Sequence, residues 1–228
     1  MKEVKNTNQE EVAFSKGVSR RKFLGYAGGL AGAGLLIASC KKEDDPVMPD
    51  GAVDLGTNDN GLLNLMFVMQ QIEAAFYEQL LNNKFTGINA QQEEYFKEML
   101  DHEIGHRELL RNYLQGKGTV VETDFSSVTF SSRLSTLENA ELIENLGVAM
   151  LNEVGRLFVA GEHVALAGKM ASLEARHAAT VSNMISKGNF FGPVDVTGVE
   201  QGSLPSNTVT TINRFLATKV SGNNLPNK

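Results

Sequence analysis

The sequence contains a single cysteine and no tryptophan among its 228 residues. One cysteine cannot form a disulfide within the chain, and no Cys-x-x-Cys pair is present to hold zinc, an iron–sulfur cluster or a rubredoxin-type iron. Basic side chains are also few, since 21 lysines and arginines stand against 27 acidic residues and the formal charge is −6. Such a chain has no general attraction for nucleic acid or anionic lipid. Stability must come from an apolar core, and a metal would have to bind histidine and carboxylate side chains.

The first 39 residues have the pattern of an export signal. Arg20 and Arg21 precede a short, glycine-rich apolar run at residues 25–39. This arrangement resembles the twin-arginine signals of bacteria. A transmembrane anchor is the alternative, although a spanning helix needs about 20 strongly apolar residues and glycine lowers helix propensity.

Cys40 directly follows Ile37, Ala38 and Ser39, which resembles a lipobox, in which the cysteine is acylated and becomes the mature N-terminus. The alternative is an ordinary buried or free cysteine. We expect a signal peptide at residues 1–39 and a polar linker at 40–59, after the lipidated Cys40. The acidic residues after Cys40 resemble a tag for outward display, with a solvated tether as the equal alternative. The sequence therefore predicts an exported lipoprotein of the bacterial cell envelope, either periplasmic or surface-facing.

Four segments between residues 60 and 188 carry apolar side chains at alternating spacings of three and four, which is typical of helices packed in a bundle. The first two cover 60–81 and 89–115, and the others begin near Ser135 and meet at a break near Ala167 and Gly168. Capping boxes are predicted at Asn89 and Ser135. Residues 116–134 are polar and long enough to cross a bundle. We predict an all-α fold of two antiparallel helix hairpins joined by one crossover, with a C-terminal extension at 189–228 whose short helix, about 207–219, covers the end of the bundle.

Six polar side chains interrupt the apolar stripes. The first and third helices carry one glutamate each, and the second and fourth carry a Glu-x-x-His pair; the residues are Glu73, Glu103, His106, Glu153, Glu174 and His177. Folding each hairpin brings its two glutamates to similar heights. Buried, unpaired carboxylates cost several kcal/mol each, and no lysine or arginine lies on the stripes. Two divalent cations would balance the four carboxylates, and an oxygen-rich set with two nitrogens suits iron or manganese.

This order of residues resembles the ferritin-like di-iron and di-manganese carboxylate proteins. The runs Asp-His-Glu-x-x-His at 101–106 and Glu-Ala-Arg-His-Ala-Ala at 174–179 look most like bacterial ferritin-like domain proteins related to desiccation-associated proteins. The resemblance covers residues 60–188. It implies terminal metal ligands at Glu73 and Glu153, bridging ligands at Glu103 and Glu174, and one histidine for each metal at His106 and His177.

The function expected from this resemblance is a membrane-tethered protein whose dinuclear centre reacts with dioxygen or peroxide, in protection against oxidative or desiccation stress. Ferroxidase-like or peroxide-consuming activity would fit, and manganese-dependent peroxide dismutation is a third reading; no catalytic residue is assigned. The rival is a non-catalytic stress-related envelope protein with structural metals. The expected partners are a membrane, through the lipid anchor, and dioxygen or peroxide, with a homodimer left open and no nucleic acid. His102 and His163 lie off the stripes and are expected at the surface.

Overall fold

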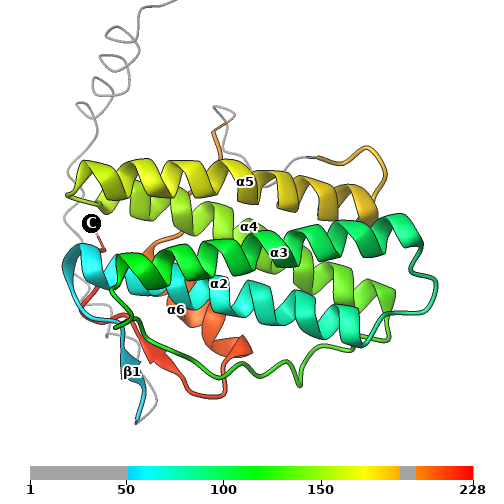
Figure 1. Ribbon diagram of the computed structural model, residues 1–228, viewed down its shortest axis with the longest axis horizontal. Coiled ribbons are helices and arrows are strands. Elements are labelled where there is room, and N and C mark those ends of the chain that lie inside the picture. The colour runs from blue at the N-terminus through cyan, green and yellow to red at the C-terminus, as the bar shows by residue number, and fades with distance from the viewer. Residues whose placement is uncertain (1–50, 191–198, 228) are drawn as a thin grey trace, which may run out of the picture. The chain divides into compact units, whose positions relative to one another are not determined.

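The computed structural model describes residues 51–190 and 199–227. Four long helices form a bundle: α2 (Asn58–Asn82), α3 (Ala90–Tyr113), α4 (Arg133–Leu157) and α5 (Gly161–Ile185). As Figure 1 shows, α2 pairs with α3 and α4 pairs with α5, and the segment 114–132 crosses from one hairpin to the other. The predicted four-helix bundle with one long crossover is confirmed. The predicted signal peptide, Cys40 and the linker up to residue 50 lie outside the described residues.

Helix α2 is buried on nearly every side. Its predicted stripe is fully covered, and the neighbouring positions Leu63, Phe67 and Val68 are buried as well. A helix that is apolar all round needs cover on every face. That cover comes from α3 and α4, from the C-terminal helix α6 (Pro205–Ile212), and from the crossover.

The crossover is fastened to α2 by two polar side chains. The Asn64 side-chain oxygen accepts the Thr119 N–H at 2.9 Å. Gln71 donates to the Thr119 carbonyl at 2.9 Å and accepts the Val121 N–H at 3.1 Å. These bonds satisfy backbone groups of a segment that has no regular secondary structure of its own.

The C-terminal helix is shorter than predicted and lies elsewhere. It ends at Ile212, and a 3₁₀ turn (Asn213–Phe215) and the strand β2 (Val220–Ser221) follow. It packs against the flank that α2 and α4 form, below the bundle in Figure 1, and not over the bundle's end. β2 pairs in parallel with β1 (Val53–Asp54), so the two ends of the described chain lie side by side.

The turn between α4 and α5 also differs from the prediction. The break was expected at Ala167–Gly168, but α5 runs through Gly168 without interruption, and the turn is formed by residues 158–160. Asp59, at the start of α2, accepts the N–H groups of Val159 and Ala160 at 2.9 Å each. Asp59 thereby satisfies amide groups at the start of α5, a role that an N-cap side chain usually has.

His163 is more enclosed than the prediction of a surface residue. Its Nδ1 lies 2.8 Å from the Asp59 carboxylate, and its side chain is only 15% exposed. The ring packs between Tyr113 and Phe158. His163 therefore helps to hold the α4–α5 turn against the start of α2.

The predicted helix starts are correct in one case of two. The capping box of Asn89 and Gln92 is present at the start of α3. Helix α4 begins at Arg133, and its N-cap is Ser132, three residues before the predicted cap Ser135. Among the described residues, no helix combines the length and the apolar character that a membrane span requires.

Candidate metal centre

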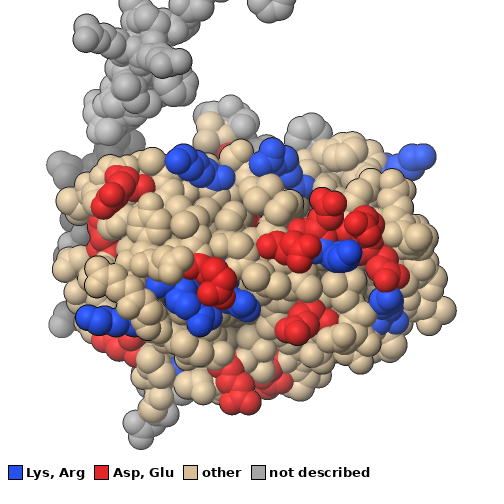
Figure 2. All heavy atoms as spheres, viewed as in Figure 1, with Lys and Arg blue, Asp and Glu red and all other residues tan. Residues whose placement is uncertain are grey.

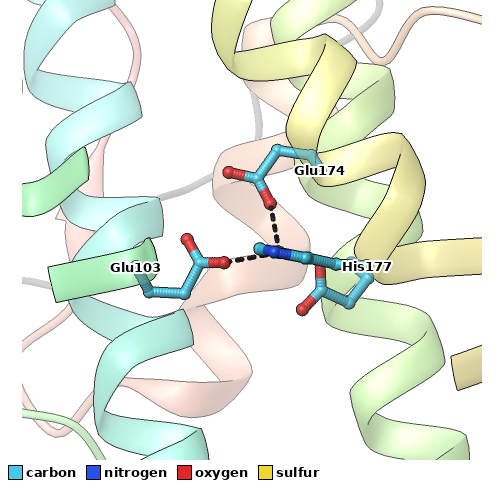
Figure 3. Close-up of side chains that lie close together, drawn as sticks. Glu103, Glu174 and His177 are labelled. Carbon is cyan, nitrogen blue, oxygen red and sulfur yellow. Dashed lines mark ion pairs between the residues drawn. The ribbon is translucent and has the colours of Figure 1, made fainter. Parts of the chain in front are cut away.

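Four buried side chains from three helices meet inside the bundle. They are Glu103 from α3, Glu144 from α4, and Glu174 and His177 from α5, and one possible ligand atom of each lies within 4.8 Å of all the others. Each is at most 4% exposed. Figure 3 shows Glu103 approaching from one side and Glu174 and His177 from the other.

The two Glu-x-x-His pairs reach across to each other. Nδ1 of His177 lies 2.7 Å from the Glu103 carboxylate, and Nδ1 of His106 lies 3.0 Å from the Glu174 carboxylate. Within each pair the histidine and its own glutamate are 3.5 Å apart. The i, i+3 spacing thus places all four groups on facing surfaces of α3 and α5.

Glu73 lies beside this group but is held by a different contact. It is fully buried, and the Gln70 side-chain amide donates a hydrogen bond to it. The same Gln70 nitrogen donates to Glu174 at 3.1 Å. Gly147 of α4 makes room for Glu73, because a Cβ atom at that glycine would lie 2.6 Å from the Glu73 carboxylate.

The prediction for the third helix needs correction, because the structure does not bring Glu153 to this cluster. Its side chain lies near the surface and pairs with Arg156. Glu144 takes its place, on a second stripe of α4 that has the same alternating spacing and is buried: Leu137, Ala140, Glu144, Gly147, Leu151 and Val154.

The position of the turn explains the error. With the turn at 158–160, Val159 lies halfway between Glu144 and Glu174, and these two glutamates reach the same height. The predicted later turn favoured Glu153 instead. A signal for Glu144 was available: it precedes Glu174 by 30 residues, the same separation that joins Glu73 to Glu103.

The six clustered residues form a repeat. Adding 71 to the numbers of Glu73, Glu103 and His106 gives Glu144, Glu174 and His177. The two hairpins therefore contribute equivalent sets of one lone glutamate and one Glu-x-x-His pair.

Burial and mutual repulsion set the protonation of the acidic groups. Burial raises the pKa of Glu73 well above its ordinary value, and the neighbouring carboxylates add to this. Burial does the same for the pKa of Glu144. Burial would also raise the pKa of Glu174, but hydrogen bonds from His106 and His177 outweigh it and lower that pKa to about 2.

The histidines shift in the opposite direction. Burial alone would lower their pKa, but hydrogen bonds to Glu103 and Glu174 raise the pKa of His106 to about 9 and that of His177 to about 10. At neutral pH the metal-free core therefore holds two imidazolium groups, each paired with a buried glutamate of the facing helix.

A family model for the ferritin-like domain matches residues 58–187, more than half of the chain. The chain belongs to the ferritin-like domain family. The matched span contains α2 to α5 and every residue of the cluster. No match was found among curated proteins.

The residues of this ferritin-like domain fit a metal. The buried oxygens Glu73 Oε1 and Glu144 Oε2 receive no hydrogen bond. Among the ion pairs of residues 51–190 and 199–227, none joins a lysine or arginine to the four buried carboxylates. Buried carboxylates need a positive partner, and divalent cations would supply it in exchange for the protons that the site now holds.

Two further residues of the ferritin-like domain support the cluster, and the sequence analysis selected neither for this role. The buried Tyr77 hydroxyl donates to the Glu144 carboxylate. His102 Nδ1 lies 3.0 Å from His177 Nε2, with the two rings within 10° of parallel. His102 also lines a surface pocket of about 230 Å³, so this histidine stands between His177 and solvent.

The outer face formed by α3 and α5 carries both signs of charge. Figure 2 shows acidic and basic side chains next to one another in small mixed groups, with uncharged surface between the groups. Among the described residues on this face there is no continuous basic patch of the kind that binds nucleic acid.

Proposed function

We propose that this ferritin-like domain holds a dinuclear iron or manganese centre that is redox-active toward dioxygen or peroxide. The observation that carries the proposal is the group of four buried carboxylates and two histidines with no lysine or arginine to balance them. The proposed ligands are Glu73, Glu103, His106, Glu144, Glu174 and His177.

When bound, iron or manganese ions would supply electrons to dioxygen or peroxide. The residues of the chain would exclude water and orient the metal ligands. Burial at 0% exposure keeps bulk water from the carboxylates. Tyr77 fixes the orientation of Glu144, and His102 fixes that of His177 by occupying the ring nitrogen that faces away from the cluster. Partners of this kind hold metal ligands in position.

Metal analysis and a turnover assay test the proposal together. Protein purified from its own host should contain two ions of iron or manganese per chain. With ferrous iron and peroxide added, the loaded protein should consume both faster than buffer does. Oxygen release from peroxide without a reductant would indicate manganese-dependent dismutation instead. Protein without bound metal would contradict the proposal.

A structural role for the metals is the rival. It is favoured by the site's position deep in the bundle, between helices that the ions would hold together. In that case the loaded protein would melt at a higher temperature than the metal-free protein, and neither ferrous iron nor peroxide would disappear faster than in buffer.

We also propose that the chain is exported and tethered to the membrane of the cell envelope through a lipid on Cys40, where it protects against oxidative or desiccation stress. Support comes from the paired arginines, the weak apolar run and the Ile-Ala-Ser-Cys sequence. Replacing Arg20 and Arg21 by lysine should leave precursor inside the cell, as a fractionation experiment would show. Normal export of that variant, or a mature chain that starts anywhere other than Cys40, would contradict the proposal.

A further inference from the structure

The ligands repeat between the two hairpins, but the residues around them do not. The offset of 71 that relates the ligands would relate Gln70 to Glu141, Tyr77 to Val148 and His102 to Leu173. Glu141 accepts a hydrogen bond from Ser182. The valine and leucine side chains cannot donate to a ligand at all. The two halves of the centre are therefore built differently.

The half that contains Glu144 is assembled. Glu103, Glu144, Glu174 and His177 already lie within reach of a single ion. Tyr77 holds Glu144 by a hydrogen bond. An ion that binds here meets ligands that need little rearrangement.

The half that contains Glu73 is obstructed. Gln70 is fully buried, and its amide nitrogen donates both to Glu73 and to Glu174. The amide therefore occupies the space between these two carboxylates and takes up one oxygen of each. Glu73 has little freedom to move away, since its other oxygen faces Gly147 at close range. The histidines do not distinguish the halves, because His106 pairs with Glu174 at 3.0 Å and His177 pairs with Glu103 at 2.7 Å; the difference lies in Gln70.

We infer that the two metal positions are unequal: the first ion binds among Glu103, Glu144, Glu174 and His177, and the second, at Glu73 and His106, binds only when Gln70 releases Glu73 and Glu174. This inference rests on the proposed dinuclear centre and adds an order of loading to it. Gln70 is a positioning residue that separates the affinities of the two steps.

Titration of metal-free protein with manganese(II) at fixed pH tests this order. Calorimetry follows the steps, and elemental analysis after gel filtration counts the bound ions. Wild type should show two steps whose dissociation constants differ by at least about tenfold, which corresponds to the loss of about one hydrogen bond when Gln70 is displaced. In Gln70→Leu, which cannot donate, the second step should tighten by about tenfold because no Gln70 hydrogen bond has to be broken, while the first step keeps its affinity.

Gln71→Leu is the matched control. It removes the same amide one position along α2, but that amide binds the backbone of the crossover and not the cluster. Both manganese steps should stay as in wild type. Circular dichroism of each variant checks that the helices are formed.

Glu73→Gln provides a second test that does not depend on Gln70. It should keep the first step with unchanged affinity and lose the second. Glu144→Gln should weaken the first step instead.

The outcomes separate the inference from the function on which it rests. The inference of unequal positions would be overturned by any of three results: two ions that bind to wild type in a single step, an unchanged second step in Gln70→Leu, or loss of the first step in Glu73→Gln. Each of these results would still be consistent with a dinuclear centre. No bound manganese or iron in wild type would overturn both.

Discussion

The choice between Glu144 and Glu153 gives a direct test of the site. Both glutamates lie on α4, and only Glu144 faces the cluster, where it is fully buried. Replacing each by glutamine removes a negative charge and keeps the size of the side chain. Glu144→Gln should lose at least one metal ion, and Glu153→Gln should keep both.

The expected size of the effect follows from burial. Four carboxylates balance two divalent cations, so Glu144→Gln leaves a net charge of +1 in a low-dielectric interior. An uncompensated buried charge costs about 3–5 kcal/mol, which corresponds to weakening of metal binding by roughly 100-fold or more. The Glu153 side chain is partly exposed and pairs with an exposed arginine. Pairs of this kind contribute little to stability.

The metal-free proteins serve as the control for folding. Burial raises the pKa of Glu144 and so favours its neutral form in the metal-free core, which glutamine resembles in shape and polarity. The unfolding free energy of metal-free Glu144→Gln should therefore change by no more than about 1.5 kcal/mol, the range of one hydrogen bond.

The assay is metal content per chain by elemental analysis, with thermal unfolding of the metal-free proteins followed by circular dichroism. Equal metal content in wild type and both variants would refute the reasoning. So would loss of metal in Glu153→Gln alone, which would mean that the helix presents its other stripe to the cluster.

Two further predictions concern packing and pH. Gly147→Ala should lower both the melting temperature and the metal content, because the new methyl group would meet the Glu73 carboxylate at 2.6 Å. In the control Gly155→Ala the methyl group makes an ordinary contact at 3.6 Å, so the metal content should be kept and the melting temperature kept or raised. Equal effects of the two variants in a melting experiment would contradict this. Asp59→Asn should cost about 1 kcal/mol of unfolding free energy at pH 7, because an amide nitrogen replaces one of the two oxygens that accept the Val159 and Ala160 N–H groups. Burial would raise the pKa of Asp59, but the backbone hydrogen bonds and His163 lower it, so its contribution is present above the unfolded pKa of about 3.9 and is lost as the pH falls further. Denaturant unfolding should show the gap between variant and wild type closing in acid, and a gap that stays constant would contradict the assignment.

The sequence determines the first hairpin well, for local reasons. The capping box at Asn89 fixes the start of α3, and the short loop before it brings Glu73 and Glu103 to one height. Glu73 and Glu103 continue the three-and-four spacing of the apolar residues on their helices, so their burial follows from spacing alone.

The second hairpin is harder to predict because its turn depends on a distant residue. The turn at 158–160 carries no proline, and its amide groups are satisfied by Asp59, about 100 residues earlier in the chain. Without knowledge of that contact, the sequence favours a turn at Gly168 as much as a turn at 158–160. Helix α4 then offers two stripes of the same spacing, each with one glutamate, and periodicity cannot choose between Glu144 and Glu153.

The residues of α2 that support the cluster could have been predicted from their spacing relative to Glu73. Gln70 and Tyr77 lie three residues before and four residues after Glu73, so they share its face of α2. Both are polar and fully buried. A search for polar residues one turn on either side of each stripe glutamate would have selected them.

The paired histidines have a consequence for how metal binding appears in a calorimeter. The metal-free core holds protons on both imidazoles, whose pKa values are raised to about 9 and about 10, and burial favours the protonated forms of Glu73 and Glu144. Ions that enter must displace these protons into the buffer. The measured heat will therefore vary with the ionisation enthalpy of the buffer, and the slope of that variation counts the protons exchanged for each ion. Loading of this bundle is an exchange of one set of cations for another inside a core that is already folded.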